Sequence, residues 1–327
     1  MKTTKLLLFM TILLMGANGA QAATKTAKAV LSSDGKTLTF EYNDQKYNTL
    51  TTKVYMLNSG AEAPGWLENK ETITTVVFGS SFRDARPTSC YQWFKDMVNL
   101  TSVEMKNPSA SESEDLNFLY LNTSVVTTMK EMFSGCSSLA TLPHLYRLST
   151  SNVTDMSSMF KNCSALTSLN FMSENEGRIN VQSQFRTTNV TTMASMFSGC
   201  TNLSSLTITN FDTSKVTNMQ AMFHNCRSLS SLNLSKFNTS SVENMAFMFN
   251  QCRKLQTIEG LDNFVTSNVT TMQQMFAWCS GLKQLNLPFN TSSVEHMEYM
   301  FGECTHLISA DISSFVFPDN TPLRNKN

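Results

Sequence analysis

The chain of 327 residues carries 25 Lys and Arg residues against 25 Asp and Glu residues, which gives a formal net charge of zero. This balance creates no global basic field that would attract nucleic acid or anionic lipid, so we expect neither partner. Only 15% of the residues are charged, whereas 41% are hydrophobic. This composition supports a large folded core and excludes a disordered, highly charged chain.

The first 22 residues have the composition of a secretory signal peptide. Lys2 and Lys5 form a positive start, residues 6–15 are apolar, and Ala20-Gln21-Ala22 is a small-x-small cleavage signal. The apolar run of about ten residues is shorter than the roughly 20 that a membrane-spanning helix needs. We therefore expect residues 1–22 to be removed on export, which leaves a secreted or cell-surface protein with no integral membrane segment.

Residues 23–86 have a pattern of their own. Residues 30–40 predict two strands around an Asp34-Gly35 turn, and residues 73–78 predict a further strand. We interpret residues 23–86 as a β-rich N-terminal cap, because a stack of repeats must cover the exposed core of its first unit. A separate binding module is the alternative.

A repeated pattern occupies residues 87–315. It reads T-[ST]-x-V-x-x-M-x-x-M-F-x-x-C-x-x-L-x-x-[LIA], and its valines are Val126, Val153, Val190, Val216, Val242, Val269 and Val294. A degenerate copy precedes these seven, with Cys90 and Phe94 at a Met position and the Phe position. A fixed period of this kind indicates a repeat array. We interpret residues 316–327, which are mostly polar, as a C-terminal tail.

Each repeat contains two kinds of apolar spacing. The Val, Met and Phe positions form one stripe of a short helix, and the Ser or Thr two residues before each Val predicts its N-cap. Gly135, Asn162, Gly199 and Asn225 lie just beyond the Phe, where a left-handed residue is tolerated. After the Cys, an L-x-x-L-x-L spacing predicts a short strand. The sequence therefore predicts an α/β repeat solenoid with short parallel strands on one face and short helices on the other.

The repeat resembles the BspA-like leucine-rich repeat of bacterial surface proteins, as in the stretch from Thr213 through Met219, Met222 and Phe223 to Cys226. The resemblance covers roughly residues 87–315. It implies an exported, surface-associated leucine-rich repeat protein whose repeats bind host or partner proteins, including extracellular-matrix proteins in some members. It does not imply a catalytic site.

The cysteines and histidines give little support for a catalytic or metal-binding site. Seven cysteines occupy one repeat position: Cys136, Cys163, Cys200, Cys226, Cys252, Cys279 and Cys304. We interpret them as buried free thiols, with disulfides between adjacent repeats as the alternative. No C-x-x-C pair or His/Cys cluster indicates a metal, and the four histidines fall at unmatched repeat positions. We expect no catalytic residue, no metal, no cofactor and no enzyme activity.

The candidate binding residues lie on the predicted strand face. One row contains Asn170, Thr207, Asn233, Glu259, Asn286 and Asp311, and the flanking row contains Ser168, Ser205, Ser231, Thr257, Gln284 and Ser309. Parallel stacking would align both rows, either as a solvated polar face or as a surface for a broad, repeated contact with a partner. An insertion around residues 173–182 adds the rim candidates Glu174, Glu176 and Arg178.

These observations predict a protein-binding function for the array. The first hypothesis is adhesion to host extracellular-matrix or cell-surface proteins. The alternative is a structural or scaffolding component of the bacterial envelope that binds other bacterial surface components. A glycan-binding protein is a third class, but it would be expected to expose aromatic platforms, and Trp66, Trp93 and Trp278 do not form a series.

Overall fold

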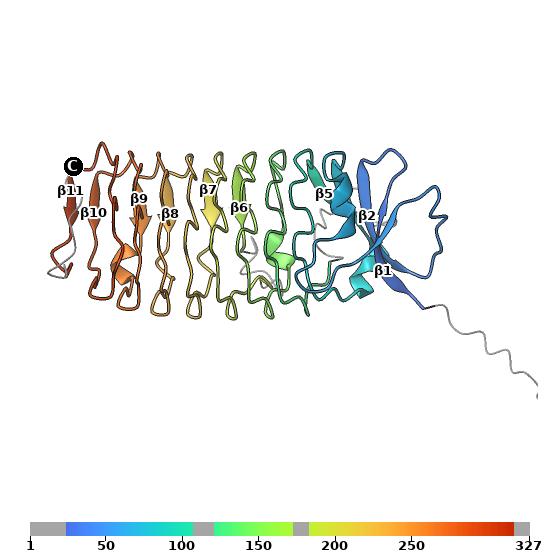
Figure 1. Cartoon of the computed structure of the whole chain (residues 1–327), viewed down its shortest axis with the longest axis horizontal. Coiled ribbons are helices and arrows are strands. Elements are labelled where there is room, and N and C mark those ends of the chain that lie inside the picture. The colour runs from blue at the N-terminus through green and yellow to red at the C-terminus, as the bar shows by residue number, and fades with distance from the viewer. Residues whose placement is uncertain (1–23, 107–120, 173–182, 317–327) are drawn as a thin grey trace, which may run out of the picture.

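The molecule is one row of stacked coils that starts at a small sheet and ends at the last strand (Figure 1). The computed structural model describes residues 24–106, 121–172 and 183–316. Each coil forms hydrogen bonds with the coils before and after it in the sequence. The packing is therefore dominated by contacts between residues one repeat apart.

Five strands form the sheet at the N-terminal end, in the order β3-β1-β2-β4-β5. β1 and β2 pair in antiparallel register, as predicted for residues 30–40, whereas β4 pairs in parallel with both β2 and β5. The strands are β1 (Thr26–Leu31), β2 (Thr37–Asn43), β3 (Val54–Met56), β4 (Thr75–Gly79) and β5 (Ser102–Lys106), and two 3-10 helices accompany them, η1 (Gly65–Asn69) and η2 (Ser80–Asp84).

The sheet is joined to the first, degenerate copy of the repeat. The Phe40 ring stacks on Trp93 of that copy with 5.0 Å between centroids, and the Trp66 Nε1–H donates to the Trp93 carbonyl at 2.6 Å. Cys90 and Phe94 donate their backbone N–H groups to the next coil at 3.0 and 2.9 Å, as the Met and Phe of a regular repeat do. The degenerate copy therefore bonds to the next coil as a regular repeat does, and the sheet packs against it.

Short strands recur along the array, one in each of its last six coils. They are β6 (Ser168–Asn170), β7 (Ser205–Thr207), β8 (Ser231–Asn233), β9 (Thr257–Glu259), β10 (Gln284–Asn286) and β11 (Ser309–Asp311). They pair in parallel as β6 with β7, β8 with β9, and β10 with β11. The prediction of short parallel strands is confirmed for these pairs.

The prediction of short helices is wrong. In the described repeats, the segment from the first Met to the residue before the Cys forms a run of tight turns, which we call the turn ladder. In one coil the Met222 N–H donates to Met219 O at 3.2 Å. The N–H groups of Met219, Ala221, Phe223 and Asn225 instead donate to the next coil, at 2.7 to 2.9 Å. An α-helix keeps its N–H groups for its own carbonyls, so this pattern excludes it. The described 3-10 helices of the array, η3 (Leu145–Arg147) and η4 (Leu261–Asn263), lie elsewhere in their coils.

The predicted helix N-caps are therefore turn residues. Before the turn ladder, Val216 donates its N–H to Thr213 O at 3.0 Å, and Ser214 donates its N–H to the Asp212 carboxylate at 3.0 Å. The other serines and threonines predicted as N-caps hold the equivalent position; these are Ser124, Ser151, Thr188, Ser240, Ser267 and Ser292. A helix and the turn ladder would both direct the same Met and Phe side chains into the core. The spacing of the apolar residues therefore did not distinguish between them.

Two positions in each turn ladder have left-handed φ angles. Ala221 and Asn225 have φ angles of 53° and 60°, and the same two positions have positive φ in the other regular repeats. The left-handed geometry predicted for Gly135, Asn162, Gly199 and Asn225 is confirmed, although no helix ends there. At Gly199 a Cβ would lie 2.2 Å from Asn162 Oδ1, so a larger residue there would require the Asn162 side chain to move.

The core is built from columns of identical residues. The Phe rings of successive turn ladders stack nearly parallel; Phe197 and Phe223, for example, have centroids 5.8 Å apart and planes 8° apart. The Met, Val, Cys and Leu positions form buried columns beside them. Because each residue packs against its own equivalent in the next coil, one pattern specifies the whole core.

Candidate binding surface

The described strands place the predicted binding residues in two rows. In each three-residue strand the middle side chain packs against the core, and the outer two side chains face away from it. Within strand pairs, the register joins Ser168 to Ser205, Asn170 to Thr207, Ser231 to Thr257, Asn233 to Glu259, Gln284 to Ser309 and Asn286 to Asp311. The structure therefore brings the predicted residues together as aligned rows in each pair, which we call the strand face.

Part of the strand face has a structural role. The side-chain oxygens of Asn170, Asn233 and Asp311 accept the N–H two residues further along, at 2.9, 3.0 and 3.0 Å. Such turns end a strand, which explains an Asn or Asp at this position. The Ser313 N–H also holds the pKa of Asp311 below its usual value. These three side chains of the strand face therefore also stabilise the turn by which the chain leaves its strand.

A cross-strand contact remains on the outer surface. Asn233 Nδ2 donates to Glu259 Oε2 at 2.6 Å, which joins β8 to β9 through their side chains. Glu259, Gln284 and Asn286 are exposed to solvent. Their amide and carboxylate groups can donate to or accept from a partner that lies along the strands. The rim candidates Glu174, Glu176 and Arg178 lie outside the described residues.

All eight cysteines are free thiols, and seven of them share one environment. Each of the seven donates its S–H to the backbone carbonyl of the Phe in the preceding coil, as Cys226 does to Phe197 O at 3.1 Å. Burial raises the pKa of these thiols. A buried neutral thiol is a poor nucleophile and a poor metal ligand, so this column serves packing and coil-to-coil bonding.

The histidines have unrelated surroundings. His144 Nδ1 lies 3.3 Å from Tyr146 Oη, His296 Nδ1 lies 3.3 Å from Glu298 Oε1, and His306 Nδ1 lies 2.9 Å from Ser280 O. His224 is half-buried, and burial lowers its pKa. Within the described part of the chain, no group of three His, Cys, Asp or Glu side chains could hold a metal ion.

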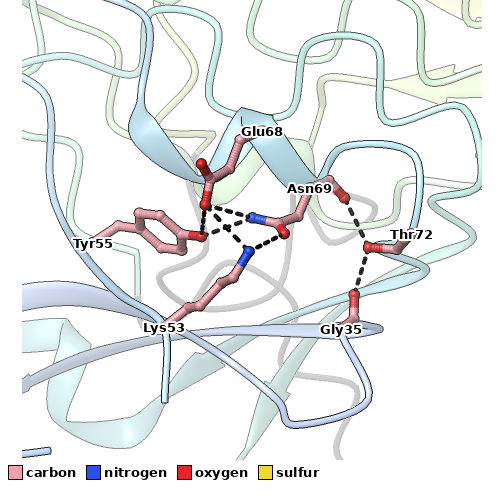
Figure 2. Close-up of polar contacts among 6 residues, drawn as sticks. All are labelled: Gly35, Lys53, Tyr55, Glu68, Asn69 and Thr72. Carbon is pink, nitrogen blue, oxygen red and sulfur yellow. Dashed lines mark hydrogen bonds and ion pairs between the residues drawn. The ribbon is translucent and has the colours of Figure 1, made fainter. Parts of the chain in front are cut away.

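A polar cluster outside the repeats lies on the N-terminal sheet (Figure 2). Tyr55 Oη donates to Glu68 Oε1 at 2.6 Å, and Lys53 Nζ lies 2.9 Å from Asn69 Oδ1. Burial and the Glu68 carboxylate raise the pKa of Tyr55 to about 12. The cluster fastens η1 to β3 and the residue before it, and Thr72 adds a bond to Gly35 O at 2.9 Å. Its groups satisfy one another, which indicates a structural tie.

The sequence reasoning missed a column of buried threonines, at the first position of the repeat pattern. Thr213 Oγ1 donates to Asn238 O at 2.8 Å and accepts the Asn238 N–H at 2.8 Å. Hydroxyl bonds to the next coil also occur at Thr150, Thr187, Thr239, Thr266 and Thr291. The strict Thr at this position was the available signal, since Ser alternates with Thr at the next position but not at this one.

A second feature was missed because it joins neighbouring coils. The Arg253 guanidinium lies 5.9 Å from the centre of the Trp278 ring, and that side chain is 45% exposed. Trp278 also has a φ of 64°, in the left-handed region that costs a non-glycine residue roughly 1–2 kcal/mol. Nothing in the repeat pattern signals this pair, because Arg follows the repeat Cys only at Arg227 and Arg253, and Trp278 is the only Trp at its repeat position.

Comparison with known proteins identifies a family for the repeats. Residues 95–171, 167–284 and 256–321 match the model of the family described as "Mycoplasma protein of unknown function, DUF285". Together these matches span residues 95–321, which is 227 of the 327 residues. No curated protein matches the chain.

Among solved structures, the crystal structure of a leucine-rich repeat protein from T. pallidum is similar to this chain with a TM-score of 0.27 and 16% sequence identity. The similarity covers 64% of this chain and 89% of that one. In residues 24–106, 121–172 and 183–316, we find no helix with the length and hydropathy needed to cross a membrane.

Proposed function

We propose, from the premise that this chain belongs to the DUF285 family, that its repeat array is a protein-binding surface without enzyme activity. The strand face is the proposed site. Its residues are Asn170, Thr207, Asn233, Glu259, Asn286 and Asp311 in one row and Ser205, Ser231, Thr257 and Gln284 in the other, with Ser168 and Ser309 at the ends.

The observation that carries this proposal is the register of the strands. Pairing such as Asn233 with Glu259 repeats the same kind of polar contact point from coil to coil. Paired parallel strands lie about 5 Å apart, so the two contact points of each strand pair are separated by about that distance. A partner that runs along the array can make many weak bonds at once, which gives useful affinity without a single strong anchor.

The proposed setting is outside the cell. Lys2, Lys5, the apolar residues 6–15 and the Ala20-Gln21-Ala22 signal support export. The resemblance of the repeat to the BspA-like leucine-rich repeat supports adhesion to a host extracellular-matrix or cell-surface protein. Scaffolding within the bacterial envelope uses the same surface and differs in the partner.

A binding experiment tests the proposal and separates the two partners. Residues 23–327 are passed over immobilised fibronectin, immobilised fibrinogen and an immobilised bacterial-envelope extract, with denatured protein as the control. Saturable binding to a matrix protein that is lost on denaturation supports adhesion. Retention by the envelope extract alone supports scaffolding. Binding to none of the three surfaces contradicts the proposal.

Variants then test the strand face. One triple variant combines the substitutions Asn233→Ala, Glu259→Ala and Asn286→Ala, because single changes in a broad contact have small effects on affinity. The matched control combines Gln220→Ala and Glu298→Ala, two exposed polar residues on the turn ladder. We expect the first set to weaken binding and the control to leave it unchanged. Equal binding by both folded proteins would place the site elsewhere.

A further inference from the structure

In two of the later repeats, a basic residue occupies the same corner of the coil. The corner is the residue after the Cys, and it stacks on its equivalent in the neighbouring coil: Ser164 Oγ donates to Ser137 O at 3.4 Å, and Ser280 Oγ donates to Arg253 O at 3.2 Å. Arg227 and Arg253 occupy this position in adjacent coils, so their backbones lie about 5 Å apart.

A third cation and an aromatic ring lie beside Arg253. Lys254 follows Arg253 and is exposed, and the Trp278 ring lies against the Arg253 guanidinium at 5.9 Å. We call Arg227, Arg253, Lys254 and Trp278 the basic corner. It lies just before the strands β8 and β9, so it borders the strand face at the end where these strands begin.

The cations of the basic corner have no carboxylate partner among the described residues, where no ion pair involves any of them. Arg227 Nε donates instead to Asn225 Oδ1 at 2.5 Å. Nearby charges on the adjoining coils are Lys283 before β10 and Glu303 in the last turn ladder, both exposed. The corner therefore keeps a net positive charge on a chain whose total charge is zero.

The exposed Trp278 side chain is the second, independent observation. Its positive φ is common to its ladder position, where Gln251 and Glu303 have φ angles of 63° and 59°, so the backbone geometry is a property of the fold. The side chain is what differs, because Trp278 is the only aromatic residue at this position and is 45% exposed. A large aromatic side chain that contributes little to the core is available to contact a partner.

We propose that the basic corner binds an acidic segment of a partner protein. An arginine stacked on an aromatic ring keeps its guanidinium edge open, and that edge pairs with a carboxylate through two parallel N–H···O bonds. Trp and Arg are also the residues most enriched at the centres of protein interfaces. Arg227 and Arg253 lie on adjacent coils, so the acidic segment would run along the array to reach both of them. The proposal does not depend on the strand face.

Two probes test the chemistry of the partner. Fluorescence anisotropy is measured for the folded chain with a fluorescein-labelled octaglutamate peptide and with an octaglutamine peptide of the same length. We expect saturable binding of octaglutamate that weakens as salt rises, and no binding of octaglutamine. A sulfated oligosaccharide serves as a competitor from a different class. No octaglutamate binding up to about 1 mM would overturn the proposal. Selective binding of the sulfated oligosaccharide would do the same.

Variants test the location. Arg253→Glu and Trp278→Ala are each expected to weaken octaglutamate binding by roughly tenfold or more, because one removes the guanidinium and the other its support. Arg253→Lys keeps the charge but not the planar edge and should be intermediate. Lys236→Glu, at an exposed lysine beyond β8, changes the net charge by the same amount as Arg253→Glu and is the charge-matched control. Thermal unfolding verifies that each variant is folded.

The outcomes separate this proposal from the proposed function. If Arg253→Glu and Lys236→Glu weaken binding equally, the effect is net charge and the basic corner is not a site. If the strand-face variants lose matrix or envelope binding while octaglutamate binding is unaltered, the two surfaces act independently. Loss of octaglutamate binding in the strand-face set, with Arg253→Glu unaltered, would overturn the basic corner alone.

Discussion

Single residues in this molecule are chosen for the bonds they make to the next coil. The buried Thr213 hydroxyl both donates to and accepts from Asn238, and the Cys226 thiol donates to Phe197 O. Each side chain is small enough to stay in the core and polar enough to satisfy a backbone group that would otherwise be buried without a partner. The strict repeat of Thr and Cys follows from this double requirement.

Replacing Thr213 by valine tests the threonine column. The Thr213→Val side chain has a similar shape but leaves the N–H and carbonyl of Asn238 without this partner, which should lower the free energy of unfolding by about 1–3 kcal/mol. Thr213→Ser retains the hydroxyl and should lose less. Urea unfolding followed by circular dichroism measures both variants. A Thr213→Val protein as stable as the Thr213→Ser protein would contradict the role of the hydroxyl.

His224 should make the molecule sensitive to mild acid. Burial lowers its pKa in the folded state below the usual 6.5, so the unfolded chain binds the proton more readily. Its contribution to stability is therefore present above the unfolded pKa and is lost as pH falls through about 6.5 toward the lower folded pKa. His224→Asn should flatten the change in unfolding free energy between pH 7.5 and pH 5.5. A variant with the same slope as the parent chain would show that other groups cause it.

At the scale of the element, the turn ladder replaces the helix that the apolar stripe predicts. Residues such as Ala221 and Asn225 take left-handed φ angles, and their N–H groups donate to the next coil. The Phe223 N–H between them does the same, whereas the Met222 and His224 N–H groups donate within their own coil. A helix of about nine residues would be marginal by itself in water. The ladder avoids this weakness because its hydrogen bonds run between coils and accumulate along the stack.

A glycine substitution distinguishes ladder from helix by the sign of its effect. Ala221 has a φ of 53°, so Ala221→Gly should relieve strain and leave the chain as stable or more stable, by up to about 1 kcal/mol. In a helix the same change would cost about 1 kcal/mol. Ala194→Gly, at a ladder position without positive φ, is the matched control and should destabilise. Thermal unfolding of both variants gives the answer, and destabilisation by Ala221→Gly would favour a helix.

At the scale of the whole molecule, the coils form one row, and each described coil is hydrogen-bonded to its neighbours (Figure 1). Stability in such arrays is close to a sum of terms for each repeat and each junction. The N-terminal sheet covers the first coil, and columns of Thr, Cys and Phe run from there toward β11. Changes that keep the columns in register should therefore be tolerated.

Deleting one repeat tests this additivity. Removing residues 216–241 joins Lys215 to Val242 and restores the T-S-x-V pattern, so Glu243 can bond Thr191 O as Thr217 now does. We expect a cooperatively folded chain with a smaller denaturant m-value and a lower free energy of unfolding. Removing residues 216–228 breaks the register and should abolish cooperative unfolding. Equal behaviour of the two deletions would argue against a register-dependent stack.

The sequence by itself determined the period, the core positions and the strands. A repeat that places Met, Phe, Cys and Leu at constant positions can bury them only by stacking, and Gly135 or Asn162 already indicated a left-handed residue. The sequence also predicted that Asn233 and Glu259 lie on one face, because side chains along a strand alternate between its two faces.

Only the tertiary structure decided where the backbone hydrogen bonds go. The partner of the Ala221 N–H is Ala246 in the next coil, and no local pattern distinguishes that bond from one inside a helix. The same holds for Arg253 and Trp278, which meet only because adjacent coils stack in register. Contacts across a junction depend on the position of one coil against the next, which local propensity does not encode.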